Sequence, residues 1–272
     1  MQQLRPQTPT LRGRDVERWQ TFLIGRGYAL QATAVYDAAT ITATKKYQRG
    51  NTLIADGVVG NSTLNAATSE GFALFAVEED SKNKYSQYWP PRPTNLAVLT
   101  DAQRKKMFGE FKYTAKPTKS NPEAIVIDPK WVEDNIVVVS AAEFEPNTHA
   151  HLGEICIHKL AADPLRALFA AWQKQGLLGY IVSWDGSFVP RFKRGRAAQQ
   201  DLSNHSWGTA FDINANENPL GAIPALYGSD GCVREMVQAA NKLGFYWGGH
   251  YSGRLDGMHF ELVRPLMAHP LT

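Results

Sequence analysis

The sequence predicts an α+β fold in which a small helical domain precedes a larger domain of mixed helices and strands. Apolar residues near the N-terminus recur at helical spacing, whereas the rest of the chain mixes helical segments with short alternating strands. These elements follow no regular βαβ repeat, which favours antiparallel sheets. With 272 residues, 43% of them hydrophobic, the chain is long enough for one large domain or two unequal ones.

The small domain is expected to contain three helices. Apolar spacing predicts a first helix capped by Asp15, a second from Asp37 or Thr40 to Gln48, and a third from near Ser62. Each helix presents its apolar positions on one side. The three helices therefore have the faces needed to pack around a common core.

Composition divides the chain into four segments. A charged, polar run and a stiff polyproline stretch at 89–93 separate the two folded units. We expect a tail at 1–9, the helical domain at 10–70, a linker at 71–93 and the large domain at 94–272.

The large domain is expected to alternate helices and strands irregularly. In chain order the predicted segments are helix 101–108, strands 125–127 and 136–139, a helix beginning at Asp163, strand 180–184 and helix 231–243. Pro164 suits a first helical turn, which places the start of that helix at Asp163.

His205 and Asp212 lie seven positions apart around Gly208. Residues 209–214 alternate, which predicts a half-buried strand with Asp212 on its polar face. A turn at Gly208 would fold His205 back over that face. An imidazole and a carboxylate held together are two ligands of an open zinc site.

A second motif near the C-terminus supplies a third ligand. Residues 256–263 predict a loop that enters a strand, with His259 and Glu261 on the polar face. Two neighbouring antiparallel strands would aim Asp212 and His259 at one point. Three protein ligands and a water are typical of a catalytic zinc rather than a structural one.

These motifs resemble a known family. The run S-x-H-x-x-G-x-A-x-D from Ser203 to Asp212, followed by D-G-M-H-F-E from Asp256, resembles the zinc D-alanyl-D-alanine carboxypeptidases, a family that includes vancomycin-resistance dipeptidases and phage L-alanyl-D-glutamate endopeptidases. The resemblance runs from about Trp89 to about Pro265. It implies one Zn²⁺ ion bound by His205, Asp212 and His259.

The resemblance also implies two catalytic residues. Asp256 stands where the family has an acidic general base, and Glu261 is its competitor because alternation puts it on the face of His259. Arg191 stands in the preceding loop, where a fixed cation would stabilise developing negative charge; Arg194 and Arg196 are the alternatives.

Four further residues are expected near the substrate. Ser203 would hydrogen-bond the substrate peptide or cap a turn, and His250 would touch the substrate. Trp207 and Trp247 are expected to wall the pocket.

The N-terminal unit resembles the three-helix peptidoglycan-binding domain of many wall hydrolases. The matching residues are Asp15-Val16, Trp19-Gln20, Gly27-Tyr28, Tyr47-Gln48, Leu53, Asp56-Gly57-Val58-Val59-Gly60 and Thr63. The loop at 34–37 departs from the usual glycine-led turn. The alternative is a helical spacer that binds nothing.

Composition limits the partners and the compartment. The net charge of +3 gives weak support for an anionic partner such as the cell wall, and no Lys/Arg run suits a nucleic acid. No stretch approaches a membrane span, and no apolar signal-peptide core is seen. We expect a monomer made in the host cytoplasm, with Cys156 and Cys232 buried and reduced.

The sequence therefore predicts a zinc peptidase that cuts stem or cross-link peptides of peptidoglycan. A wall-binding domain joined to such a hydrolase fits a phage endolysin, admitted by a holin to the wall in the periplasm or outside the cell. One alternative is a bacterial D,D-carboxypeptidase or a secreted antibacterial effector with the same chemistry. Another is a non-catalytic wall-binding protein whose zinc is structural.

Overall fold

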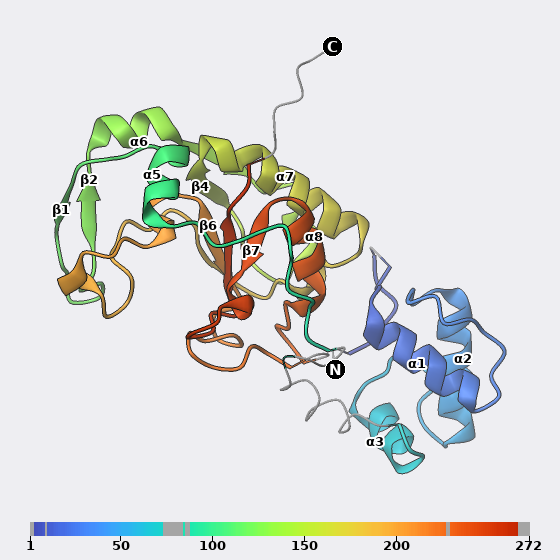
Figure 1. Cartoon of the computed structure of the whole chain (residues 1–272). Helices are drawn as coiled ribbons and strands as arrows, with labels where there is room; N and C mark the ends of the chain where they lie inside the picture. Colours follow the sequence, from blue (N-terminus) through green and yellow to red (C-terminus); the bar gives the residue numbers. More distant parts are fainter. Residues whose placement is uncertain (1–2, 9, 73–83, 85–87, 227–228, 266–272) are drawn as a thin grey trace.

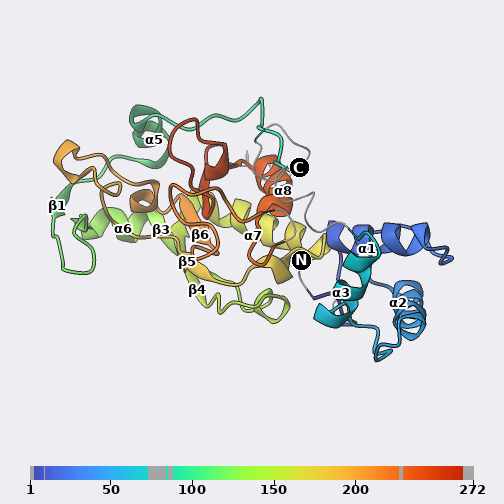
Figure 2. The same cartoon turned by 90° about the horizontal axis from the view of Figure 1, so that it is seen from below.

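The computed structural model describes residues 3–8, 10–72, 84, 88–226 and 229–265. A small helical domain lies at one end of a larger α+β domain, and the hairpin of β1 and β2 lies at the opposite end (Figures 1 and 2). The predicted fold class is confirmed. Parts of the predicted tail, most of the predicted linker and the C-terminal end lie outside the described residues.

The small domain consists of α1 (Arg14–Gly25), α2 (Ala38–Gly50) and α3 (Asn61–Ser69) around an aromatic core. The indole of Trp19 is fully buried and donates to the hydroxyl of Thr44 at 2.8 Å. Tyr47 and Phe72 pack edge-on against the same indole. Phe72 belongs to this core, so the packing of the small domain includes a residue two positions beyond Glu70.

The helix starts of the small domain agree with the sequence in two cases of three, since α3 begins at Asn61, next to the predicted Ser62. The second helix was predicted to start at Asp37 or Thr40. Asp37 caps α2, because its carboxylate accepts a hydrogen bond from the backbone N–H of Thr40 at 2.8 Å. For α1 the prediction was wrong: Gly13 is the capping residue, and Asp15 lies in the first turn. A carboxylate there still interacts favourably with the helix dipole.

The large domain contains short helices and small antiparallel sheets. The described helices are α5 (Asp101–Phe108), α6 (Pro129–Asn135), α7 (Lys159–Lys174) and α8 (Val237–Lys242). Two hairpin sheets pair β1 (Tyr113–Ala115) with β2 (Ile125–Ile127) and β3 (Ile136–Ser140) with β4 (Glu154–His158). The central sheet has the strand order β5-β6-β8-β7. Its strands are β5 (Trp184–Gly186), β6 (Ala210–Ile213), β8 (His259–Leu262) and β7 (Phe245–Trp247).

The central sheet packs on α7 through aromatic rings. Trp172 of α7 lies edge-on to Phe211 of β6 and Phe260 of β8, and these two phenyl rings stack at 5.3 Å. The Trp172 indole donates to the carbonyl of Met236 just before α8. This core holds β6 and β8, the two strands that carry the predicted metal ligands, against a rigid support.

Three predicted elements differ from the structure. Helix α7 begins at Lys159 rather than Asp163, because the His158 side chain caps it by accepting from the N–H of Leu160. In the strand predicted at 180–184, Tyr180 instead ends a 3₁₀ turn and 181–183 form a loop. The N–H groups at 182 and 183 donate to the Asn214 side chain, and β5 begins only at Trp184. The helix predicted at 231–243 is a 3₁₀ turn (Arg234–Met236) followed by the short α8.

The cysteines are both free, but only Cys232 is buried. Cys156 is exposed because it occupies an outward position of β4, where Ile155 and Ile157 point inward. The prediction that both are buried was therefore wrong for Cys156. Within the described part of the chain, no helix combines the length and apolar character needed to cross a bilayer.

His158 makes the stability of the large domain depend on pH. The residue is 1% exposed, and its ring accepts from Leu160 N–H at Nδ1 and donates from Nε2 to the Phe108 carbonyl. Burial lowers the pKa of His158 from 6.5 to about 4, against the opposing effect of that carbonyl. Between these values the unfolded chain binds the extra proton, so the free energy of unfolding is expected to fall by up to about 3 kcal/mol as pH drops from 6.5 to 4.

The contribution of His158 is measured as a difference between two melting curves. His158→Asn keeps a side chain that caps helices but does not titrate. The loss of thermal stability between pH 6.5 and 4 is expected to be smaller in this variant than in the wild type. His149→Asn is the matched control, because the His149 side chain is exposed and its replacement is expected to leave the pH dependence of stability unchanged. Equal acid sensitivity of wild type and His158→Asn would refute the assignment.

Candidate metal centre

Strand pairing brings two of the predicted ligands together. In the antiparallel pairing of β6 and β8, Asp212 stands directly opposite His259. Side chains of directly opposed residues lie on the same face of a sheet and close together. The register of the two strands therefore places the carboxylate and the imidazole side by side.

A tight turn brings the third side chain over these strands. His205 lies in the 3₁₀ turn Asn204–Trp207, which ends at Gly208 in the left-handed conformation (φ 64°). A Cβ at Gly208 would lie 2.9 Å from the backbone nitrogen of His158, so both the conformation and the close approach require glycine. The turn predicted from the motif is thus present, and it directs His205 toward Asp212.

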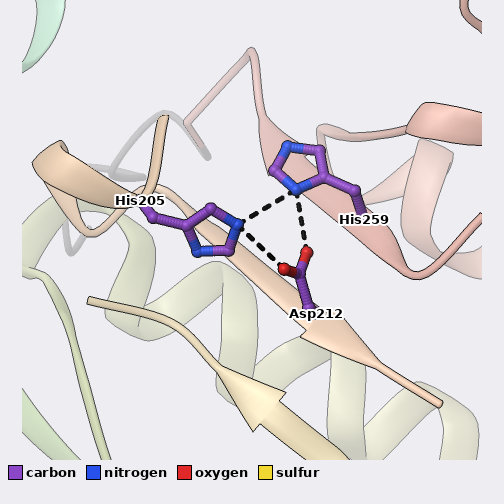
Figure 3. Close-up of side chains that lie close together, drawn as sticks. All are labelled: His205, Asp212 and His259. Carbon is purple, nitrogen blue, oxygen red and sulfur yellow. Dashed lines mark hydrogen bonds and ion pairs between the residues drawn. The ribbon is translucent and has the colours of Figure 1, made fainter. Parts of the chain in front are cut away.

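The three side chains converge on one point (Figure 3). His205 Nε2 lies 3.2 Å from Asp212 Oδ2 and 3.2 Å from His259 Nδ1, and His259 Nδ1 lies 2.9 Å from Asp212 Oδ1. Ligands about 2.0 Å from a tetrahedral zinc ion are separated by roughly 3.3 Å. The donor set and its spacing therefore fit a small divalent cation with nitrogen and oxygen ligands.

Hydrogen bonding leaves the correct histidine atom available. His205 Nδ1 lies 2.8 Å from the carbonyl of Ser187, so this nitrogen carries the proton and Nε2 presents its lone pair to the cluster. The Ser187 hydroxyl is in turn fixed by the carbonyl of Cys156. Ser187 was missed in the sequence because a backbone carbonyl leaves no residue-type signal.

The electrostatics of the cluster favour a positive charge at its centre. Burial alone would raise the pKa of Asp212, but His205 and His259 hold it well below its ordinary value. Burial opposes protonation of His259, yet the hydrogen bond and charge of Asp212 raise the pKa of His259 to about 9. An ionised carboxylate buried beside two imidazoles requires a cation, which a proton or a metal ion supplies.

Asp256 faces the same pocket. The pocket has a volume of about 170 Å³, and its lining includes Asp256 with His205 and His259. Among the described residues, the buried Oδ1 of Asp256 has no hydrogen-bond partner. Burial raises the pKa of Asp256, which suits a group that exchanges protons. The carboxylate therefore keeps an unused hydrogen-bond acceptor beside the pocket.

Arg191 is the best placed of the three candidate arginines. It lines the pocket, and its charge interacts with Asp212 and Asp256, while burial is the main cause that lowers its pKa. Arg194 also lines the pocket, but its guanidinium is paired with Glu123 at 2.7 Å. Arg196 is paired with Asp201 at 3.2 Å.

Ser206 anchors the backbone of Arg191, which the sequence did not indicate. The Ser206 hydroxyl donates to the Arg191 carbonyl at 2.8 Å and accepts from its N–H at 3.0 Å. Because Ser206 adjoins His205, the metal-ligand turn also positions the arginine loop. Bridges from Arg191 to Ala124 and from Phe192 to Leu202 hold the rest of that loop.

The predicted substrate contacts divide into two groups. Ser203 lines the pocket. Trp207 and Trp247 are instead core residues, 1% and 0% exposed, with indole N–H groups bonded to the carbonyls of Gly109 and Gly257. His250 is also buried, and its Nε2 contacts the Pro90 carbonyl. These last three are not among the residues that line this pocket.

Glu261 lies behind the pocket rather than in it. Its side chain is 1% exposed and accepts hydrogen bonds from Tyr251 and Asn204. Both carboxylate oxygens are thus engaged, whereas Asp256 keeps one free. Of the two carboxylates considered for the general base, only Asp256 lines the pocket.

Comparison with protein families gives the class of the protein. Residues 196–262 match the family model described as D-alanyl-D-alanine carboxypeptidase, and residues 12–67 match that of a peptidoglycan binding domain. The chain is a peptidase directed at peptidoglycan. The segment of the large domain that matches the D-alanyl-D-alanine carboxypeptidase model contains the metal cluster and Asp256. No curated protein matches the chain.

Proposed function

We propose that the chain is a zinc-dependent peptidase that hydrolyses stem or cross-link peptides of peptidoglycan. One zinc ion per chain would be held by His205 Nε2, His259 Nδ1 and the Asp212 carboxylate. The observation that carries the proposal is the convergence of these atoms beside the unpartnered Oδ1 of Asp256. When bound, zinc supplies Lewis acidity and makes water nucleophilic near neutral pH.

The residues around the pocket would supply proton transfer, charge stabilisation and substrate binding. Asp256 accepts a proton from the attacking water and delivers it to the leaving amine, a role that its raised pKa supports. Arg191 holds a fixed positive charge near the scissile carbonyl, where negative charge develops. Ser203 contributes a polar contact to the substrate peptide.

The small domain would raise the local concentration of the enzyme at its substrate. Once the binding module has bound the wall, the attached hydrolase domain meets its substrate at a high effective concentration. This pairing supports the proposal of a phage endolysin that cuts L-alanyl-D-glutamate or D,D-cross-link bonds and relies on a holin for access. A bacterial D,D-carboxypeptidase or a secreted effector uses the same site on a different bond.

Digestion of purified peptidoglycan tests both the chemistry and the bond. Removing the metal with a chelator is expected to stop digestion, and adding zinc is expected to restore it. Mass spectrometry of the products then distinguishes released D-alanine from cleaved L-alanyl-D-glutamate or cross-links. Undiminished digestion by the metal-free protein contradicts the proposal. A protein that binds wall and zinc but releases no peptide would instead be the non-catalytic alternative, which the free oxygen of Asp256 disfavours.

A further inference from the structure

Glu261 is a buried carboxylate that the proposed reaction does not use. It lies on β8 two residues after His259, stands opposite Ala210 of β6 and is 1% exposed. An ionised carboxylate only accepts hydrogen bonds, and burying one without donors is strongly unfavourable. The hydrogen-bond donors around the Glu261 carboxylate therefore identify the segments that this side chain connects.

Three separate segments supply those partners. The Tyr251 hydroxyl donates to Oε1 at 2.7 Å, and the Asn204 amide makes a short hydrogen bond to Oε2. The guanidinium of Arg104, on α5, lies 3.6 Å from Oε2. Tyr251 lines the pocket, and Asn204 precedes the ligand His205. Glu261 thus joins helix α5, the ligand turn and the pocket wall to strand β8.

Arg104 is built into the same arrangement. It is 2% exposed, its Nη1 contacts Asp101 at 2.7 Å, and its Nη2 donates to the Leu99 carbonyl at 3.0 Å. The guanidinium also lies over the ring of Trp207, 5.4 Å from its centroid.

Helix α5 consequently holds both ends of the ligand turn. Arg104 reaches Asn204 at the start of the turn through Glu261, and it packs on Trp207 at the end. The residue after the helix, Gly109, accepts the indole N–H of that tryptophan at 2.9 Å. His205 lies between these two fixed points, so its freedom to move away from His259 is limited from both sides.

We propose that Arg104 and Glu261 are positioning residues of the metal site, which tie the turn carrying His205 to the strand carrying His259. This inference rests on the proposed function, because it concerns the affinity of the same three ligands for zinc. It makes α5, which lies outside the family-matched segment 196–262, part of the support of the active site. Partners beyond the direct ligands commonly change metal affinity by roughly 10–100-fold.

The test measures zinc affinity of the full chain by competition with a chelator. Glu261→Gln keeps the size of the side chain but turns an acceptor oxygen into an NH₂ group among donors. It is expected to weaken zinc binding roughly 10–100-fold. Tyr251→Phe removes only one hydroxyl, and this milder variant is expected to give a smaller loss while remaining folded. Glu154→Gln, at an exposed position of β4, is the matched control with unchanged affinity.

A second readout separates positioning from general stabilisation. The absorption spectrum of the cobalt-substituted protein reports ligand geometry, and it is expected to change in Glu261→Gln and in Arg104→Met. Because the two residues act as a pair, their double variant is expected to lose less affinity than the product of the single losses. Variants that melt earlier but keep wild-type affinity and spectrum overturn the inference. A wild-type protein that binds no zinc overturns the proposed function itself.

Discussion

His205→Ala is expected to abolish zinc binding at micromolar concentrations and to reduce peptidoglycan digestion more than about 100-fold. Residues beyond the direct ligands already change metal affinity by roughly 10–100-fold, so loss of a proposed ligand should cost more. His205 is a suitable choice because its ring is fixed by Ser187 and points only Nε2 at the cluster. The measurements are zinc content after dialysis and the rate of peptide release from purified wall.

The control for this variant is another histidine in the same domain. His149→Ala removes an imidazole outside the metal cluster and is expected to bind zinc and digest wall as the wild type does. Circular dichroism establishes that His205→Ala is folded before its zinc content is compared. A folded His205→Ala protein with one tightly bound zinc ion would show that the cluster is not the metal site.

The cluster could be predicted because each motif carries its own geometry. The period of two along a strand places Asp212 and His259 on polar faces, and the glycine after the ligand turn allows the chain to reverse. What the sequence does not contain is the register that sets Asp212 opposite His259. That register depends on the whole sheet and on its packing against α7.

Large aromatic residues near a motif are harder to interpret. Trp207 and Trp247 have the size and polar edge of pocket walls, but the same properties let them fill a core and donate to a backbone carbonyl. Both occupy the core here. For Glu261, alternation correctly places the side chain on the face of His259, but the contact with Arg104, far away in the sequence, leaves no trace in the local pattern. Contacts between distant segments leave no local pattern.

The same limit applies to element boundaries. Pro164 favoured a helix start at Asp163. The helix instead begins at Lys159, because the side chain of His158, the last residue of β4, caps it. For Cys156 the signal was present: alternation with Ile155 and Ile157 places the thiol outward. The general burial preference of cysteine outweighed that local evidence in the prediction.

Asp256→Asn is expected to lower kcat roughly 10²–10⁴-fold while leaving zinc affinity close to the wild-type value. The amide keeps the shape of the side chain but neither accepts the proton of the attacking water nor returns it to the leaving amine. Zinc remains bound because its proposed ligands are unchanged. The two measurements, kcat on a soluble wall peptide and zinc affinity, separate this variant from His205→Ala, which loses both.

The matched control and the rival base decide whether Asp256 has this role. Asp163→Asn changes a highly exposed carboxylate on α7 and is expected to leave kcat unchanged. If Asp256→Asn retained full kcat, the proton transfer would have to come from another group. Glu261 is poorly suited to replace it, because its two oxygens are bonded to Tyr251 and Asn204 behind the pocket wall. A large loss of kcat with intact zinc affinity would therefore assign the proton transfer to the one carboxylate that both lines the pocket and keeps a free oxygen.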